Sequence, residues 1–264
     1  MEFLLHIFAG AGVGFLIGLT GVGGGSLMTP LLLLFGYPAP IAIGTDLLYA
    51  ALTKASGALV HHRSGNVNWH VVGLLALGSV PTSILLHGLV LDISVRDSAK
   101  FEELLTSSLG AMLILTATML IFREKLRFNA VNDRPERLMG LLHKHRSGVT
   151  CLMGVILGIC VTLSSVGAGA FCAAILLIIY SKIPVIQIIA IDIAHAVPLT
   201  FIAGLGYLIA GYVDLVLLCS LLIGSLPAIH LGSKVSNAVP DKLLQQLLII
   251  VLLSLGIYYS VASL

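Results

Sequence analysis

The chain has 264 residues, of which 58% are hydrophobic and only 10% are charged. This is more apolar surface than one soluble core can hide, so we expect lipid to be the main solvent and exclude a water-soluble fold. The formal charge of +2 is too small to favour nucleic acid as a partner, and the basic residues gather mostly in one hydrophilic stretch.

The first half of the chain is predicted to form five helical segments, over residues 3–19, 26–36, 40–62, 69–91 and 101–122. Their apolar runs approach the roughly 20 residues that a bilayer core demands. A cleaved signal peptide has Lys or Arg before its apolar stretch, and the first segment has neither. We therefore interpret it as a retained membrane segment.

A glycine cluster separates the first two segments. Each Gly costs a helix about 1 kcal/mol relative to Ala, so the helix should break there. A break at membrane depth is tolerated only where protein or a water-filled cavity satisfies the backbone, and the helix that follows points its free N–H groups into the break. The sequence therefore predicts a mid-membrane anion site that includes Thr20, Gly21, Val22, Gly23, Gly24, Gly25 and Ser26.

The third segment carries ionisable residues, which cost at least roughly 2.5 to 3.5 kcal/mol inside a membrane. Asp46 suits proton coupling, or holding the broken loops, or a structural bond to amides at a helix N-terminus. Lys54, about two turns further on, can attract an anion, pair with Asp46 or snorkel to the cytoplasmic face. The basic patch His61-His62-Arg63 can recruit anions or anchor the helix at the interface.

A hydrophilic linker follows the fifth segment. Residues 123–146 are rich in Lys and Arg and contain Pro135, which predicts a cytoplasmic position by the positive-inside rule. We divide the chain into a first membrane repeat over residues 1–122, a basic linker over 123–147 and a second membrane repeat over 148–264.

The second half repeats the first, with segments predicted over residues 149–163, 168–181, 185–209, 213–234 and 242–262. Sliding the chain against itself by 146 residues aligns residue types that ordinary helix composition would not favour. The aligned pairs are Pro38 with Pro184, Asp46 with Asp192, Gly65 with Gly211, Gly78 with Gly224, Ser79 with Ser225 and Pro81 with Pro227.

A second glycine cluster lies at the matching place in the second half. We predict that it breaks the helix and adds substrate-binding groups from Ser164, Ser165, Val166, Gly167 and Gly169. Alternatively, the glycines only allow close helix packing. Asp192 and His195 stand three residues apart on one helix face, which suits a proton relay or a hydrogen-bonded structural histidine.

The orientation of the repeats depends on the first two segments of each half. If these segments form a re-entrant pair, the halves are inverted, and of the loop charges only Arg96 and Lys100 lie outside. If they form one full crossing, the halves are parallel, and Lys182, Lys234 and Lys242 move outside as well. The positive-inside rule favours the inverted arrangement.

These motifs resemble the TauE/SafE sulfite exporter family over essentially the whole chain. The resemblance is carried by the glycine motif that ends at Ser26 with Pro30 after it, by Gly44-Thr45-Asp46, and by the repeated Gly-x-Val-Asn/Asp turns. Members of that family are membrane transporters linked to export of sulfite, sulfoacetate and related sulfur-containing anions. The resemblance implies this substrate class, where the residues alone indicate a small anion.

We therefore expect an all-α integral membrane protein with two inverted repeats of about five segments, broken by glycine-rich helices at mid-membrane. The expected function is a secondary transporter that exports a small sulfur-containing anion across the plasma membrane. An anion channel of the same fold and an intramembrane aspartyl protease built on Asp46 and Asp192 are the alternatives. We expect no enzyme activity, no cofactor and no metal. The expected partners are lipid and the anion, and homodimers are common among such carriers.

Four cysteines lack metal-ligand spacing and are interpreted as small buried hydrophobes: Cys151, Cys160, Cys172 and Cys219.

Overall fold

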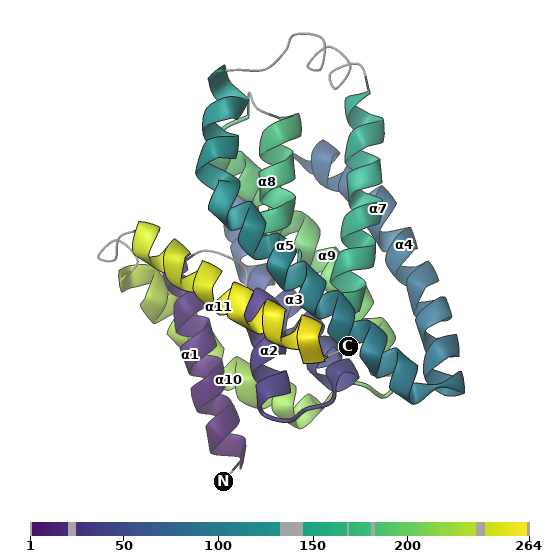
Figure 1. The fold of residues 1–264 in the computed structure, drawn as a ribbon. Helices are drawn as coiled ribbons and strands as arrows, with labels where there is room; N and C mark the ends of the chain where they lie inside the picture. Colours follow the sequence, from purple (N-terminus) through teal and green to yellow (C-terminus); the bar gives the residue numbers. More distant parts are fainter. Residues whose placement is uncertain are drawn as a thin grey trace.

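The computed structural model of the chain describes residues 2–20, 25–132, 145–167, 169–180, 183–235 and 241–262. Within these residues the fold is entirely helical, which confirms the predicted class (Figure 1). The helices are α1 (Glu2–Thr20), α2 (Gly25–Leu34), α3 (Ala39–Arg63), α4 (Trp69–Arg96), α5 (Ser98–Asn132), α7 (Arg146–Ser164), α8 (Ala170–Ile179), α9 (Val185–Ile209), α10 (Leu215–Val235) and α11 (Asp241–Ala262).

Five of these helices have apolar stretches long enough to cross a membrane. They are Trp69–Leu89, Ala99–Phe122, Arg146–Ser164, Val185–Ile209 and Leu215–Val235. Helices α2 and α8 have only 10 residues each, which is about 15 Å and half of a bilayer core. The chain is therefore a multi-pass membrane protein with two described helices that are too short to cross the hydrophobic layer alone.

The predicted segment boundaries hold well, with one clear exception. Helix α9 spans residues 185–209, as expected, whereas α5 continues to Asn132 instead of ending at 122. Residues 123–127 read Arg-Glu-Lys-Leu-Arg, and all five are good helix formers. The first part of the predicted linker is therefore helical, because polarity ends a membrane span without ending a helix. Residues 133–144 lie outside the described residues.

The main helix contacts join the two halves of the chain. Helix α1 packs along α10, α4 along α7, α3 against α9, and α5 against α11 (Figure 1). If α1 corresponds to α7 and α4 to α10, as the alignment proposes, the first two pairs are exchanged by that correspondence. The other two pairs map onto themselves. The halves therefore interlock, and the packing is what a two-fold relation between the repeats would produce.

Glycines allow the close approach of the paired helices. A Cβ atom at Gly224 would overlap the Ile7 carbonyl oxygen of α1, and one at Gly78 would overlap the Cys151 carbonyl oxygen of α7. These two glycines are aligned residues in the predicted repeat. Small residues at helix crossings are what membrane packing selects. Gly78 and Gly224 therefore serve close helix packing, but they lie outside the two glycine clusters for which packing was the alternative interpretation.

The turns after α3 and α9 share one backbone geometry. Gly65 and Gly211 have positive φ angles of 69° and 79°, which suits glycine at the end of a helix. The amide that follows each glycine donates to the carbonyl oxygen five residues earlier, from Asn66 to the His61 oxygen at 3.1 Å and from Tyr212 to the Tyr207 oxygen at 2.9 Å. The repeated Gly-x-Val-Asn/Asp motif thus forms the same helix-ending turn twice.

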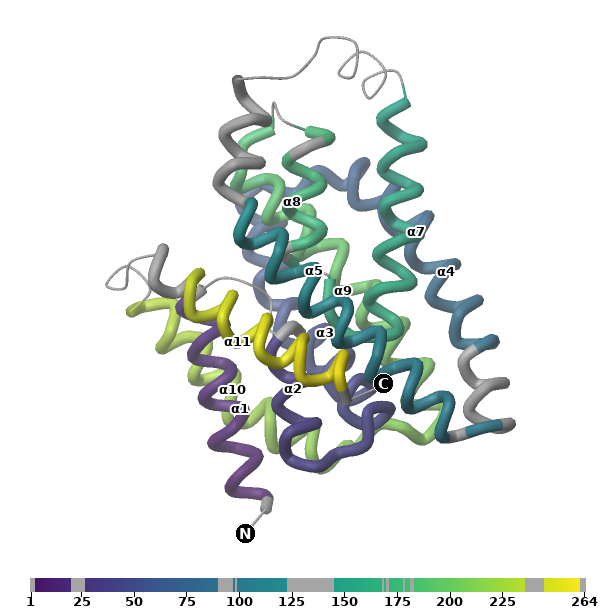
Figure 2. Tube along the Cα trace, viewed as in Figure 1, coloured from purple at the N-terminus to yellow at the C-terminus, as the bar shows by residue number. Residues whose placement is uncertain are grey.

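The helices that begin the two halves run in opposite senses. In Figure 2, α1 starts at the lower end of the molecule, beside the N label, and α7 starts at the upper end. The inverted arrangement of the repeats remains a prediction, and the opposite directions of these two helices support it.

Candidate functional site

Helices α3 and α9 cross closely at the centre of the molecule. Gly204 on α9 leaves no space for a Cβ beside Leu48, and Gly44 on α3 lies against Tyr207 and the Tyr212 carbonyl oxygen. This crossing brings buried polar side chains together with the ends of the short helices. We call this group the central polar cluster: Thr29, Asp46, Lys54, Ser165, Cys172, Asp192 and His195.

Asp46 joins α3 to the start of the short helix α2. Its Oδ2 accepts hydrogen bonds from the Thr29 amide at 3.2 Å and from the Thr29 hydroxyl at 2.5 Å. The side chain is fully buried. Asp46 Oδ2 thus bonds an amide, as the structural interpretation expects, but this amide belongs to the fifth residue of α2 and not to a helix N-terminus.

The second helix break follows the prediction. Helix α7 ends at Ser164 and α8 begins at Ala170, and between them Ser165 takes a left-handed backbone with φ 57°. The Ser165 side chain is buried and lies beside Asp46. The Ser165 hydroxyl interacts with the Asp46 carboxylate, and within the described residues no further hydrogen-bond partner is found for Ser165 Oγ or Asp46 Oδ1. Two buried polar atoms of this kind mark a place where a polar ligand can bind.

Lys54 is buried close to both carboxylates. Its ammonium group interacts electrostatically with Asp192 on α9 and with Asp46 on its own helix. Only 8% of the residue is exposed, so it does not snorkel to the cytoplasmic face, which was one of the interpretations left open. A buried ammonium needs such partners, since burying an unpaired charge is costly.

Asp192 lies against the short helix of its own half, as Asp46 does. Its carboxylate contacts the thiol of Cys172 on α8. His195, one turn further along α9, pairs through Nε2 with the Ser79 hydroxyl of α4 at 2.8 Å. The described hydrogen bonds therefore join His195 to Ser79 and not to Asp192. Asp192 Oδ1 and His195 Nδ1 have no hydrogen-bond partner among the described residues.

Not every predicted binding residue is available in the structure. Ser164 was expected to offer a free hydroxyl, but its Oγ bonds the Cys160 carbonyl oxygen at 2.6 Å and accepts from the Val166 amide at 3.2 Å. It therefore shapes the break and does not present a donor. Gly167 and Gly169, with φ angles of 118° and 152°, complete the break.

The first glycine cluster is described only at its edges. Thr20 ends α1 and Gly25 begins α2, with Ser26 inside α2. The predicted residues Gly21, Val22, Gly23 and Gly24 lie outside the described residues.

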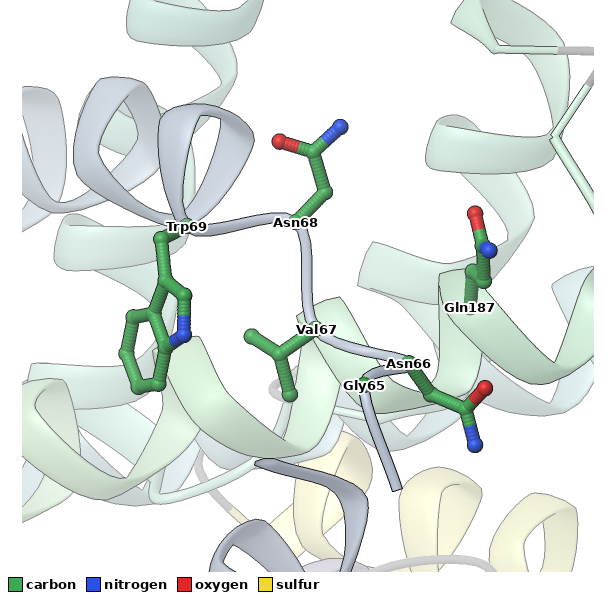
Figure 3. Close-up of a pocket in the computed structure, with 6 residues that line it drawn as sticks. All are labelled: Gly65, Asn66, Val67, Asn68, Trp69 and Gln187. Atoms are coloured by element: carbon green, nitrogen blue, oxygen red, sulfur yellow. The ribbon is translucent and has the colours of Figure 1, made fainter. Parts of the chain in front are cut away.

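A separate polar pocket of about 340 Å³ lies at the end of α3 (Figure 3). It is lined by the turn from Gly65 to Trp69 and by Gln187 of α9. The Trp69 indole N–H donates to His62 Nδ1 at 3.3 Å, which fixes part of the predicted basic patch. Because the central polar cluster is buried and carries the charged groups, we place the candidate site there and not in this pocket.

Sequence reasoning missed Thr29 and Cys172 as members of the cluster. A threonine or a cysteine in an apolar helix is ordinary, and Cys172 was interpreted as a buried hydrophobe. The structure keeps it buried and free but places its thiol against Asp192. Only the position of α8 beside α9 reveals this contact.

Comparison with known sequences identifies the family of the chain. The profile of the family described as Sulfite exporter TauE/SafE matches residues 6–259. The chain belongs to the TauE/SafE family. It is 36% identical to the "Probable membrane transporter protein YjnA" of Bacillus subtilis (strain 168), over 95% of this chain and 97% of that protein. It is 28% identical to the "Probable membrane transporter protein MJ0441" of Methanocaldococcus jannaschii, over 97% and 96% of the two chains. No solved structure matches it.

Membership of the TauE/SafE family decides between the classes of function considered for the sequence. The family and the named relatives are membrane transporters, so this chain is a transporter and not an intramembrane protease. The two aspartates also have separate partners, Thr29 for Asp46 and Cys172 for Asp192. The central polar cluster is therefore our candidate for the transport site.

Proposed function

We propose that this TauE/SafE transporter exports a small sulfur-containing anion, such as sulfite or sulfoacetate, across the plasma membrane by alternating access. The observation that carries the proposal is the meeting of a helix break with buried charge at Ser165, Asp46 and Lys54. The start of α8, the Ser165 hydroxyl and the Lys54 ammonium supply the donors and positive charge that a sulfonate or sulfite oxygen requires.

The carboxylates explain how binding can be coupled to protons. Asp46 and Asp192 each lie against the short helix of their own half, where an anion would bind. Two carboxylates and one ammonium carry a net negative charge when all three are ionised, and this charge repels an anionic substrate. We propose that one of the two takes up a proton when the anion enters. Proton and anion then bind together.

The proposal is tested by thermal unfolding of the purified protein in detergent with sulfite, thiosulfate, sulfoacetate or chloride. A ligand at one hundred times its Kd stabilises a protein by about 2.7 kcal/mol. We expect saturable stabilisation by a sulfur-containing anion and much less by chloride. If none of the three sulfur-containing anions stabilises the protein, the proposed substrate class is wrong.

Variants connect the binding to the site. Ser165→Ala should weaken anion binding, because it removes the buried hydroxyl at the break. Ser254→Ala is the matched control, since the Ser254 hydroxyl bonds the Val251 oxygen of its own helix α11 at 3.0 Å. Sulfoacetate should bind more tightly as the pH falls, and Asp192→Asn should weaken this dependence. Equal binding by both serine variants would remove Ser165 from the site.

A further inference from the structure

A buried row of polar side chains leads away from His195 along α4. Ser79, Ser83 and His87 stand four residues apart, so they form one stripe on the helix, and all three are buried. The stripe covers about 12 Å of the helix axis. Together with residues of α7 and α9 it forms what we call the polar row: Ser79, Ser83, His87, Thr162, His195 and Tyr207.

Contacts among three helices hold the polar row together. Ser79 Oγ lies 2.8 Å from His195 Nε2, and one turn further on the Thr162 hydroxyl donates to Ser83 Oγ at 2.8 Å. The Tyr207 hydroxyl donates to the Thr162 carbonyl oxygen at 3.0 Å. Helices α4, α7 and α9 therefore surround a seam of polar side chains, in which the successive members on α4 stand about 6 Å apart along the helix axis.

His87 forms the outer end of the polar row. Its ring meets Tyr207 edge-on, with centroids 5.2 Å apart, and fills the space beside Gly206. The residue is only 8% exposed, and its Nε2 has no hydrogen-bond partner among the described residues. His87 stands close to the end of the apolar stretch Trp69–Leu89. A histidine at this position can accept a proton from water at the membrane surface.

The corresponding helix of the other half lacks such a row. In the alignment, Ser225 corresponds to Ser79, but Ile229 and Ser233 correspond to Ser83 and His87. Ile229 interrupts the stripe, and Ser233 is exposed and donates to the His230 oxygen of its own helix at 2.9 Å. Within the described residues, the stripe of α4 is thus not repeated on α10. A packing role required equally in both halves would not explain this difference.

We infer that the polar row is the path by which protons reach Asp192 from the side of the membrane where α4 ends. This inference rests on the proposed coupling of anion binding to protonation. A proton leaves water for His87 Nε2, passes along the hydroxyl groups of the row to His195, and ends on the Asp192 carboxylate one turn away on α9. His195 Nδ1 and Asp192 Oδ1 are the unpaired atoms at that end.

Other titratable groups at the inner end belong to the central polar cluster. Lys54 of α3 interacts electrostatically with Asp192 and with His195, and the Cys172 thiol of α8 contacts Asp192. At the outer end, His87 lies against Tyr207, Gly206 and the backbone of Ala203, all on α9. A route through the polar row therefore meets Lys54 and the carboxylate only at its inner end.

The test follows protonation of Asp192 directly and needs no substrate. The purified protein is taken through a rapid change from mildly alkaline to mildly acidic pH, and the infrared band of the protonated carboxyl group is recorded with time. The part of the band that is lost in Asp192→Asn reports this residue. We expect His87→Phe and Thr162→Val to slow its appearance by about tenfold while its final amplitude is kept, because a proton relay sets a rate and not an equilibrium.

Controls separate this role from a structural one. Thr82→Val is the matched control on α4. The Thr82 hydroxyl donates to the Gly78 oxygen of the same helix at 2.7 Å, and Thr82 is not a member of the polar row. If His87→Phe and Thr162→Val, each folded as judged by thermal unfolding, protonate Asp192 as fast as Thr82→Val, the path is wrong. Absence of any Asp192 band would also overturn it.

The anion-binding measurement is a separate arm of the experiment. Sulfoacetate binding that persists in His87→Phe while protonation is slow supports both the site and the path. If no anion stabilises the wild-type protein but the carboxyl band still slows in the variants, the proposed substrate class fails and the path stands. The two ideas can thus fail independently.

Discussion

At the scale of single residues, Lys54 should stabilise the fold through its charge. Lys54→Met leaves Asp46 and Asp192 buried without the ammonium that lies close to both. Removing one partner of a buried ionic group costs about 3 to 5 kcal/mol. We expect the free energy of unfolding in detergent to fall by this amount, measured by chemical denaturation. Adding Asp192→Asn to Lys54→Met should recover part of it; no recovery would mean that Lys54 acts through packing alone.

Thr29 is predicted to fix the short helix α2 against α3. Thr29→Val removes the hydroxyl that donates to Asp46 Oδ2 and leaves the hydrogen bond from the residue 29 amide in place. A hydrogen bond to a charged group contributes about 1.5 to 3 kcal/mol, and we expect that loss in the same denaturation experiment. Thr29→Ser keeps the donor and serves as the control. A serine variant as unstable as the valine variant would contradict the prediction.

The sequence predicts the charged members of the site better than its neutral members. Asp46, Lys54, Asp192 and His195 stand out because ionisable residues are costly in apolar helices, and the structure places all of them in one cluster. Ser164 and Ser165 look equivalent in the sequence. Ser164 bonds the backbone of the break, whereas Ser165 faces Asp46. This difference depends on the backbone of the break and appears only in the folded chain.

At the scale of helices, the close glycine contacts predict sharp differences between neighbouring positions. Gly78→Ala would place a methyl group on the Cys151 carbonyl oxygen of α7, whereas Gly73 on the same helix has open space around its Cα. Overpacking costs about 1 to 3 kcal/mol, so we expect Gly78→Ala to lower the thermal stability. Gly73→Ala should leave it unchanged or raise it, by up to about 1 kcal/mol. Similar losses in both variants would contradict the close packing of α4 and α7.

Helix boundaries could be predicted from local signals, but helix partners could not. Glycine clusters and Pro184 mark where helices end and begin, and apolar runs mark the spans. The seams of α1 with α10 and of α4 with α7 carry similar small residues. Nothing in these local patterns says that each helix pairs with the opposite half, because that choice depends on the whole packing.

At the scale of the whole molecule, the inverted arrangement predicts opposite accessibility of equivalent turns. Ser64 and Ala210 end α3 and α9 in the same backbone conformation. In a background without the four native cysteines, Ser64→Cys should react with a membrane-impermeant thiol reagent only from the cytoplasm. Ala210→Cys should react only from outside. Labelling of both from one side would establish parallel repeats.

The order of synthesis gives the pairing of α1 with α10 a further meaning. Helix α1 is synthesised before α10, which covers its glycine face, and residues 21–214 are made between the two helices. During insertion, α1 therefore waits beside lipid or the insertion machinery until α10 arrives. A chain released before residue 215 is made would leave the glycine face of α1 without the helix that covers it.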